Sequence, residues 1–223
     1  MPMDALSLAL FFHPEYAPED RLPRAKALVP LFTSNSGVPL SVFETSTDLM
    51  SVDRDARFEA GHREITLRDT ERSEPISGEV SISHYDDGGW AVISVVFTIY
   101  PYDRRETERT WSYATRLAPK VVAAAKPTFA VLTGLSDWPD PSKLKPGQLP
   151  PLGPWNWFSL ESLPDTRRKQ LAALPGAHRF EQIADGFLLQ LVPDVYSKPS
   201  PDMMAVLAQL GTKYSAPKPP PRE

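Results

Sequence analysis

The sequence contains no cysteine, which excludes disulfide bonds, thiol nucleophiles and thiolate metal ligands. Histidine is scarce too, and no two of the four histidines have the spacing of metal ligands. The glycine-rich phosphate-binding motifs, the G-x-S-x-G nucleophile motif and the H-E-x-x-H zinc motif are all absent. We therefore expect no cofactor, no metal ion and no recognisable catalytic residue.

Long hydrophobic runs and excess positive charge are also missing. The longest apolar stretch, 90–100, has about half of the roughly 20 residues that a membrane-spanning helix needs. The first residues lack the basic region of a secretory signal peptide, so we expect a cytoplasmic protein. A net charge of −4 gives no general attraction to nucleic acid or to anionic membranes. We therefore expect neither as a partner.

Proline is abundant, with 25 residues among 223. Several of them fall in 135–154, which has no hydrophobic periodicity and reads as a long exposed connection. Others fall in 213–223, which we expect to be a disordered tail. The hydrophobic fraction of 41% is typical of a globular protein. The sequence thus predicts a single domain over 1–212, with a possible subdivision at 135–154.

The N-terminal half combines alternating apolar segments with two helical patterns. Residues 5–12 alternate as a half-buried strand does, and 90–100 is apolar on both faces, as in a central strand. Other strands are expected at 38–43, 62–68 and 79–85, whereas 45–61 is ambiguous. Helices are expected at 19–32 and after Asp103, where Pro119 should kink or split the second one.

The C-terminal half repeats this mixture. Strands are expected at 129–132 and 155–160, and a helix from Ser162 to Leu174. Residues 179–183 and 187–192 read as a hairpin with an Asp-Gly turn, and a last helix starts at Ser200-Pro201. The fold class is therefore α+β, with a mostly antiparallel sheet (a meander plus a C-terminal hairpin) and about four helices packed against it.

Acidic and aromatic residues are the candidates for contacting a partner. Trp138 lies between prolines in the long connection, and exposed aromatic side chains are enriched at protein interfaces. Trp155 shares one face of its strand with Trp157, which is also compatible with core packing. Acidic groups would suit a basic partner. The predicted partner-binding residues are Trp138, Asp137, Asp140, Trp155, Asp86 and Asp87.

One segment resembles a known family. It runs from Trp155-Asn156-Trp157-Phe158 through a short helix ending at Leu174-Pro175-Gly176 to a hairpin with Gly186-Phe187-Leu188-Leu189-Gln190, and it closes with a helix after Pro201. This order is similar to the C-terminal part of immunity proteins of polymorphic-toxin and type VI secretion systems. The resemblance covers about the last 60 residues and rests on aromatic and glycine positions.

The resemblance implies a cytoplasmic protein that binds a cognate secreted effector and occludes its active site. Two alternatives remain open at this point. The first is an enzyme, for example a hydrolase, that uses His84 beside Asp86 and Asp87, or His178 beside Glu181 and Asp185. The second is an adaptor of a secretion system.

Overall fold

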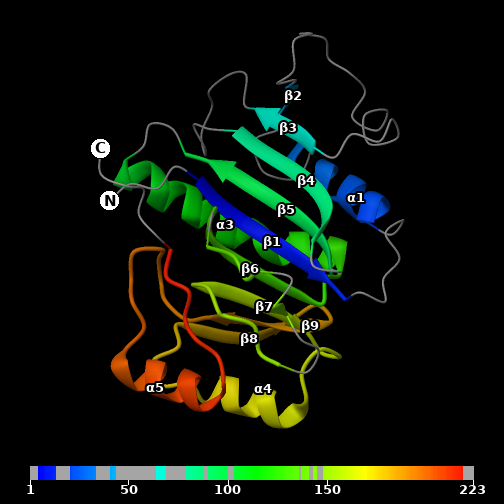
Figure 1. The fold of residues 1–223 in the computed structure, drawn as a ribbon. Helices are drawn as coiled ribbons and strands as arrows, with labels where there is room; N and C mark the ends of the chain where they lie inside the picture. Colours follow the sequence, from blue (N-terminus) through cyan, green and yellow to red (C-terminus); the bar gives the residue numbers. More distant parts are fainter. Residues whose placement is uncertain are drawn as a thin grey trace.

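The computed structural model describes residues 5–13, 21–33, 41–43, 64–68, 79–87, 90–99, 103–135, 137–140, 143–144 and 148–217. Nine strands form one sheet, in which every pair of neighbouring strands is antiparallel. Their order is β2-β3-β4-β5-β1-β6-β7-β9-β8 (Figure 1). Four helices accompany the sheet in the described ranges. The predicted α+β fold with a mostly antiparallel sheet is confirmed.

The elements follow the expected positions closely. The strands are β1 (Ala5–Phe12), β2 (Ser41–Phe43), β3 (Glu64–Arg68), β4 (Glu79–Asp87), β5 (Trp90–Thr98), β6 (Phe129–Gly134), β7 (Trp155–Ser159), β8 (Arg179–Ile183) and β9 (Gly186–Gln190). The helices are α1 (Arg21–Thr33), α3 (Arg104–Ala125), α4 (Asp165–Ala172) and α5 (Pro201–Gln209).

Strand β1 joins the two halves of the chain. It pairs with β5 on one side and with β6 on the other, and β6 in turn pairs with β7 beyond the long connection. All eight of its residues are buried, rather than alternate ones as the sequence predicted. The reason is that both faces of the sheet are covered at this strand. The halves on either side of 135–154 therefore share one continuous sheet.

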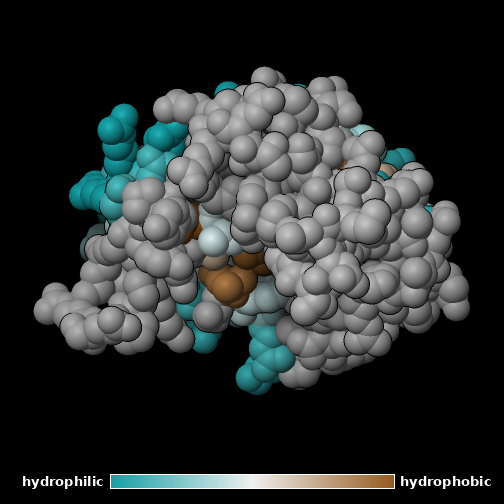
Figure 2. Space-filling model, turned by 90° about the horizontal axis from the view of Figure 1, so that it is seen from above, coloured by the Kyte–Doolittle hydropathy of each residue, from teal (hydrophilic) through white to brown (hydrophobic). Residues whose placement is uncertain are grey.

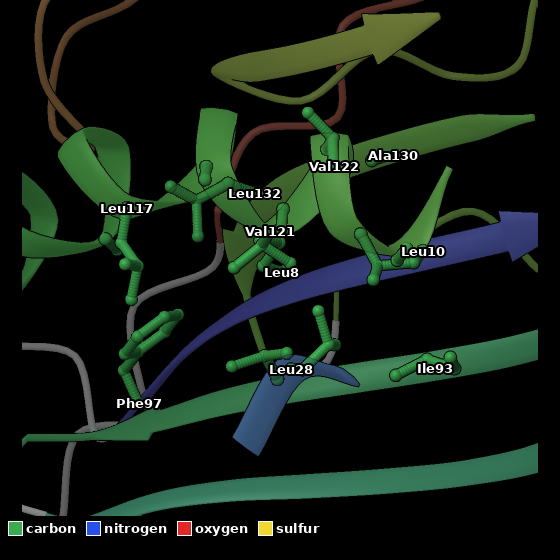
Figure 3. Packing of buried hydrophobic residues seen from close by; sticks show 14 of the residues in the cluster. Leu8, Leu10, Leu28, Ile93, Phe97, Leu117, Val121, Val122, Ala130 and Leu132 are labelled. Atoms are coloured by element: carbon green, nitrogen blue, oxygen red, sulfur yellow. The ribbon is translucent and has the colours of Figure 1, made fainter. Parts of the chain in front are cut away.

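Helices α1 and α3 cover one face of the sheet and lie behind it in Figure 1. Leu8 and Leu10 of β1 point toward Leu28 of α1 and Val121 of α3 (Figure 3). Asp103 caps the start of helix α3, and its carboxylate accepts a hydrogen bond of 2.7 Å from the backbone N–H of Glu106, as the sequence predicted. It then runs to Ala125 without splitting at the proline within it.

Helices α4 and α5 cover the opposite face at the other end of the sheet, below β7, β9 and β8 in Figure 1. Leu171 of α4 and Leu207 of α5 are fully buried there. A row of phenylalanine rings crosses this face, with neighbouring centroids 5.0–5.5 Å apart from Phe11 through Phe129 and Phe158 to Phe187. The fold thus has helices on both faces of the sheet.

Two further expectations need correction. Helix α4 begins at Asp165 rather than after Ser162, because the Ser162 hydroxyl donates to the Ser159 carbonyl and forms a turn instead of a cap. The expected disordered tail also does not include residues 213–215. Leu152 and Lys213–Ser215 are joined by backbone hydrogen bonds of 2.8 Å, which hold this segment against the long connection. Segments 45–61 and 218–223 lie outside the described residues.

Gly186 illustrates how closely this end of the sheet is packed. A Cβ atom at this position would overlap the carbonyl oxygen of Phe158 and the indole ring of Trp157. Gly186→Ala is therefore expected to lower the free energy of unfolding by about 1–3 kcal/mol, as overpacking usually does. Urea denaturation measures this loss. Ala172→Ser, at an exposed position of α4, is the control, and equal stability of the two variants would contradict the packing described here.

Viewed from above, the molecule shows hydrophilic residues at several places on its outline and a small hydrophobic area near the centre (Figure 2). None of the described helices combines the length and apolar character needed to cross a membrane.

Candidate functional site

The acidic candidates lie at opposite ends of the sheet. The backbone N–H of Asp137 donates 3.1 Å to the carbonyl of Gly134, which pairs with Leu6 at the start of β1. Asp86 lies at the other end, because it pairs with Ala91, which in turn pairs with Phe12 at the end of β1. Asp87 follows Asp86 in the same hairpin. The backbones of Asp137 and of the Asp86–Asp87 segment therefore lie far apart along the strands.

Their local surroundings also differ. Asp137 is buried, with 7% of its surface exposed. Asp140 is exposed and forms an ion pair of 2.6 Å with Lys143, and this carboxylate raises the pKa of the Lys143 amine through a hydrogen bond and its charge. Of the two acidic candidates in the long connection, Asp140 is therefore the one with an accessible carboxylate. The side chains of Asp86 and Asp87 lie outside the described part of the structure.

The two candidate tryptophans pack on different faces of the sheet. Trp155 is 1% exposed in the core beneath α1 and α3, which leaves no side-chain surface for a partner in this conformation. Trp138 is half-buried and packs against the cluster on the other face. Trp138 remains a candidate contact through the exposed part of its ring.

The candidate histidines lie in or beside different strands of the sheet. His84 is half-buried in β4, opposite Ile93 of β5. His178 is exposed before β8, and neighbouring Glu181 forms an ion pair with Arg179. Within the described ranges, no three histidine, aspartate or glutamate side chains gather as metal ligands do.

An open groove of about 380 Å³ lies between α4 and the β8–β9 hairpin. Aromatic rings of Phe180 and Phe187 form part of its floor, and their centroids are 5.4 Å apart. The groove is lined by Leu160, Asp165, Arg168, Lys169, Ala172, Phe180, Gln182 and Phe187. It is therefore apolar at its base, with charged side chains along the α4 rim.

The charged side chains on the α4 rim differ in whether they form an ion pair. Arg168 forms an ion pair with Asp165. Lys169 is exposed and has no ion pair within the described residues. On the hairpin, Arg179 and Glu181 neutralise each other. The groove consequently carries one uncompensated positive charge beside its aromatic floor, although the whole chain has a net charge of −4.

A second distinctive group is Tyr214, which packs against the same face of the sheet. Burial, followed by the charge of Asp194, raises the pKa of its phenol well above the ordinary value of 10.0. The hydroxyl is buried and makes no hydrogen bond within the described ranges. A phenol in this position is expected to stay neutral well into the alkaline range.

This shift predicts how stability depends on pH. A pKa raised in the folded state stabilises the protein below the unfolded value of about 10, and this contribution is lost as pH rises toward the folded value. Tyr214→Phe removes an unpaired hydroxyl, so we expect an unfolding free energy within about 1 kcal/mol of wild type at pH 7. Above about pH 10 the variant should become more stable than wild type. Urea denaturation at both pH values tests this prediction. An equal loss of unfolding free energy in wild type and variant as the pH rises would contradict it.

This chain has a distant structural neighbour among known proteins. No family model matches it, and no curated protein is similar to it in sequence. Among solved structures, it is similar to a T6SS protein of Pseudomonas aeruginosa, with a TM-score of 0.47 and 12% sequence identity. The match covers 93% of this chain and 73% of that protein. A likeness at this level identifies neither a family nor an activity.

Proposed function

We propose that this chain is an immunity protein, which binds a cognate bacterial effector toxin and blocks the toxin's active site. One observation carries the proposal. The segment that resembles such proteins folds as the resemblance implies, with an aromatic strand β7, the short helix α4, the glycine hairpin β8–β9 and the final helix α5.

The residues of that motif support a structural role within this unit. Trp155, Trp157 and Gly186 are buried where β7 meets β9, and Gln190 donates 3.0 Å to the carbonyl of Val192 after the hairpin. Motif residues of this kind maintain a scaffold and leave the exposed positions free to vary with the partner. A preorganised scaffold suits an inhibitor that occludes a site through a stable interface.

Co-expression with the product of the neighbouring gene tests the proposal. We expect the two proteins to copurify through a tag on either one and to run as one complex in size-exclusion chromatography. The effector alone should reduce cell growth. If the neighbouring product does not copurify and growth is unaffected, the proposal is wrong. A complex with a harmless neighbour would instead favour the secretion-adaptor alternative.

A further inference from the structure

Strand β8 is the last strand on its side of the sheet. Its hairpin turns at Ala184-Asp185, one residue earlier than the predicted Asp-Gly turn, so that Ile183 and Gly186 form the pair that closes the turn. In a two-residue hairpin this closing pair is hydrogen-bonded, and hydrogen-bonded pairs then alternate along the ladder. Arg179, Glu181 and Ile183 therefore bond to β9, whereas the backbone N–H and C=O groups of Phe180 and Gln182 face outward.

The opposite side of β9 supports this alternation. The N–H of Leu160 donates 2.9 Å to the carbonyl of Asp185, and the N–H of Leu191 donates 2.9 Å to the carbonyl of Pro154. The backbone N–H and C=O groups of the odd-numbered residues in and beside β9 thus point toward β7. Those of the even-numbered residues therefore point toward β8. Among the residues that the structure describes, no strand pairs with the outer side of β8.

The open edge and the groove occupy the same place. Phe180 and Gln182, whose backbone groups face outward, also line the groove with their side chains. A strand added beside β8 would therefore hydrogen-bond to these two residues and direct its alternate side chains over Phe180 and Phe187, toward α4.

We propose that an extended segment of the partner binds along β8 as an additional strand. It places an apolar side chain over the aromatic floor of the groove and an acidic side chain beside Lys169. This inference rests on the proposed function, in that the partner is the effector that the chain neutralises. Backbone pairing supplies affinity in this mode of recognition, and the groove supplies specificity.

The charge at the groove favours an effector segment over a second copy of this chain. Arg168 is already paired with Asp165, so Lys169 is the cation that an incoming carboxylate would meet. A second copy pairing through its own β8 would present Phe180 and Gln182 on the groove face, and neither is acidic. Its Glu181 lies on the other face of the strand and is paired with Arg179.

Affinity for the neighbouring gene product, measured by isothermal titration calorimetry, tests this site. Gln182→Pro removes an outward N–H donor without removing a bond to β9, and proline is tolerated on such edges. We expect binding about fivefold weaker, since one lost hydrogen bond contributes about 1 kcal/mol. Lys169→Glu should weaken binding at least as much, whereas Lys120→Glu, an exposed lysine of α3 on the other face, should leave it within about twofold.

Hydrogen exchange measured by NMR gives a readout that does not depend on any substitution. The amide protons of Phe180 and Gln182 should exchange rapidly in the free protein and slowly in the complex. That of Glu181 should be protected in both states. Because this measurement uses the wild-type chain, it decides the matter even if Gln182→Pro does not fold.

The outcomes separate the two proposals. If the wild-type chain does not bind the neighbouring gene product, the proposed function is wrong. If it binds, but the variants bind equally well and the two amides still exchange rapidly, docking at β8 is wrong and the function stands. A dimer of this chain that Gln182→Pro dissociates would assign the edge to a second copy and overturn the inference.

Discussion

Trp155→Ala is expected to lower the free energy of unfolding by about 3–5 kcal/mol, the usual cost of removing a large aromatic side chain from a core. Trp155 is 1% exposed and belongs to the cluster that α1 and α3 cover. Its loss leaves a cavity beside β6 and β9, which the paired strands cannot close by moving. Urea denaturation followed by circular dichroism measures the change.

Met204→Ala is the matched control, because this side chain is 39% exposed on α5. Its unfolding free energy should stay within about 0.5 kcal/mol of wild type. The folded fraction of Trp155→Ala should bind the effector with wild-type affinity. A stable variant with greatly reduced affinity would instead place Trp155 at the interface and contradict the packing seen here.

Asn156→Leu is expected to cost about 2–4 kcal/mol, although leucine has a similar size and is apolar. The Asn156 side chain is fully buried and closes a local ring with Gly153, whose N–H donates to Oδ1 at 2.9 Å. Its Nδ2 donates to the carbonyl of Gly153 at 2.8 Å and to that of Leu189 at 3.2 Å. Leucine leaves the buried N–H and C=O groups of Gly153 without these partners.

Gln209→Leu provides the comparison for Asn156→Leu, since it makes the same kind of change at an exposed position of α5. We expect its unfolding free energy to stay within about 0.5 kcal/mol of wild type. Equal stability of the two variants would show that the hydrogen bonds between Asn156 and Gly153 contribute nothing to stability. The difference between their denaturation midpoints in urea decides this.

Much of the fold follows from local patterns that the sequence displays. Alternation in 5–12 and 179–192 predicts strands, and the serine and proline at 200–201 predict a helix start that the structure contains. The burial of β1 on both faces could not be predicted from its local pattern. It depends on helices from distant parts of the chain, which cover the two sides of the sheet.

The surface was harder to predict than the fold. Asp86 and Asp137 were both predicted to contact a partner, but the register of the strands places their backbones at opposite ends of the sheet. The alternation that places Trp155 and Trp157 on one face does not reveal that helices cover that face. Local spacing says which side chains share a face, whereas exposure depends on long-range packing.

The groove was missed for a related reason. The sequence does show the alternation of Phe180 and Gln182 and the basic run at 167–169. That basic run fits the end of a helix equally well. Only the position of β8 at the edge of the sheet, with α4 packed nearby, brings these features together. A hairpin pattern in a sequence does not say which of its strands is left unpaired.

Survival of cells that express the effector of the neighbouring gene tests the central claim most directly. Viable counts should fall when the effector is induced alone and return to the uninduced level when this chain is co-expressed. Lys169→Glu should reduce that protection, and Lys120→Glu should preserve it. Cells that die equally with and without this chain, although both proteins are present, would contradict the account.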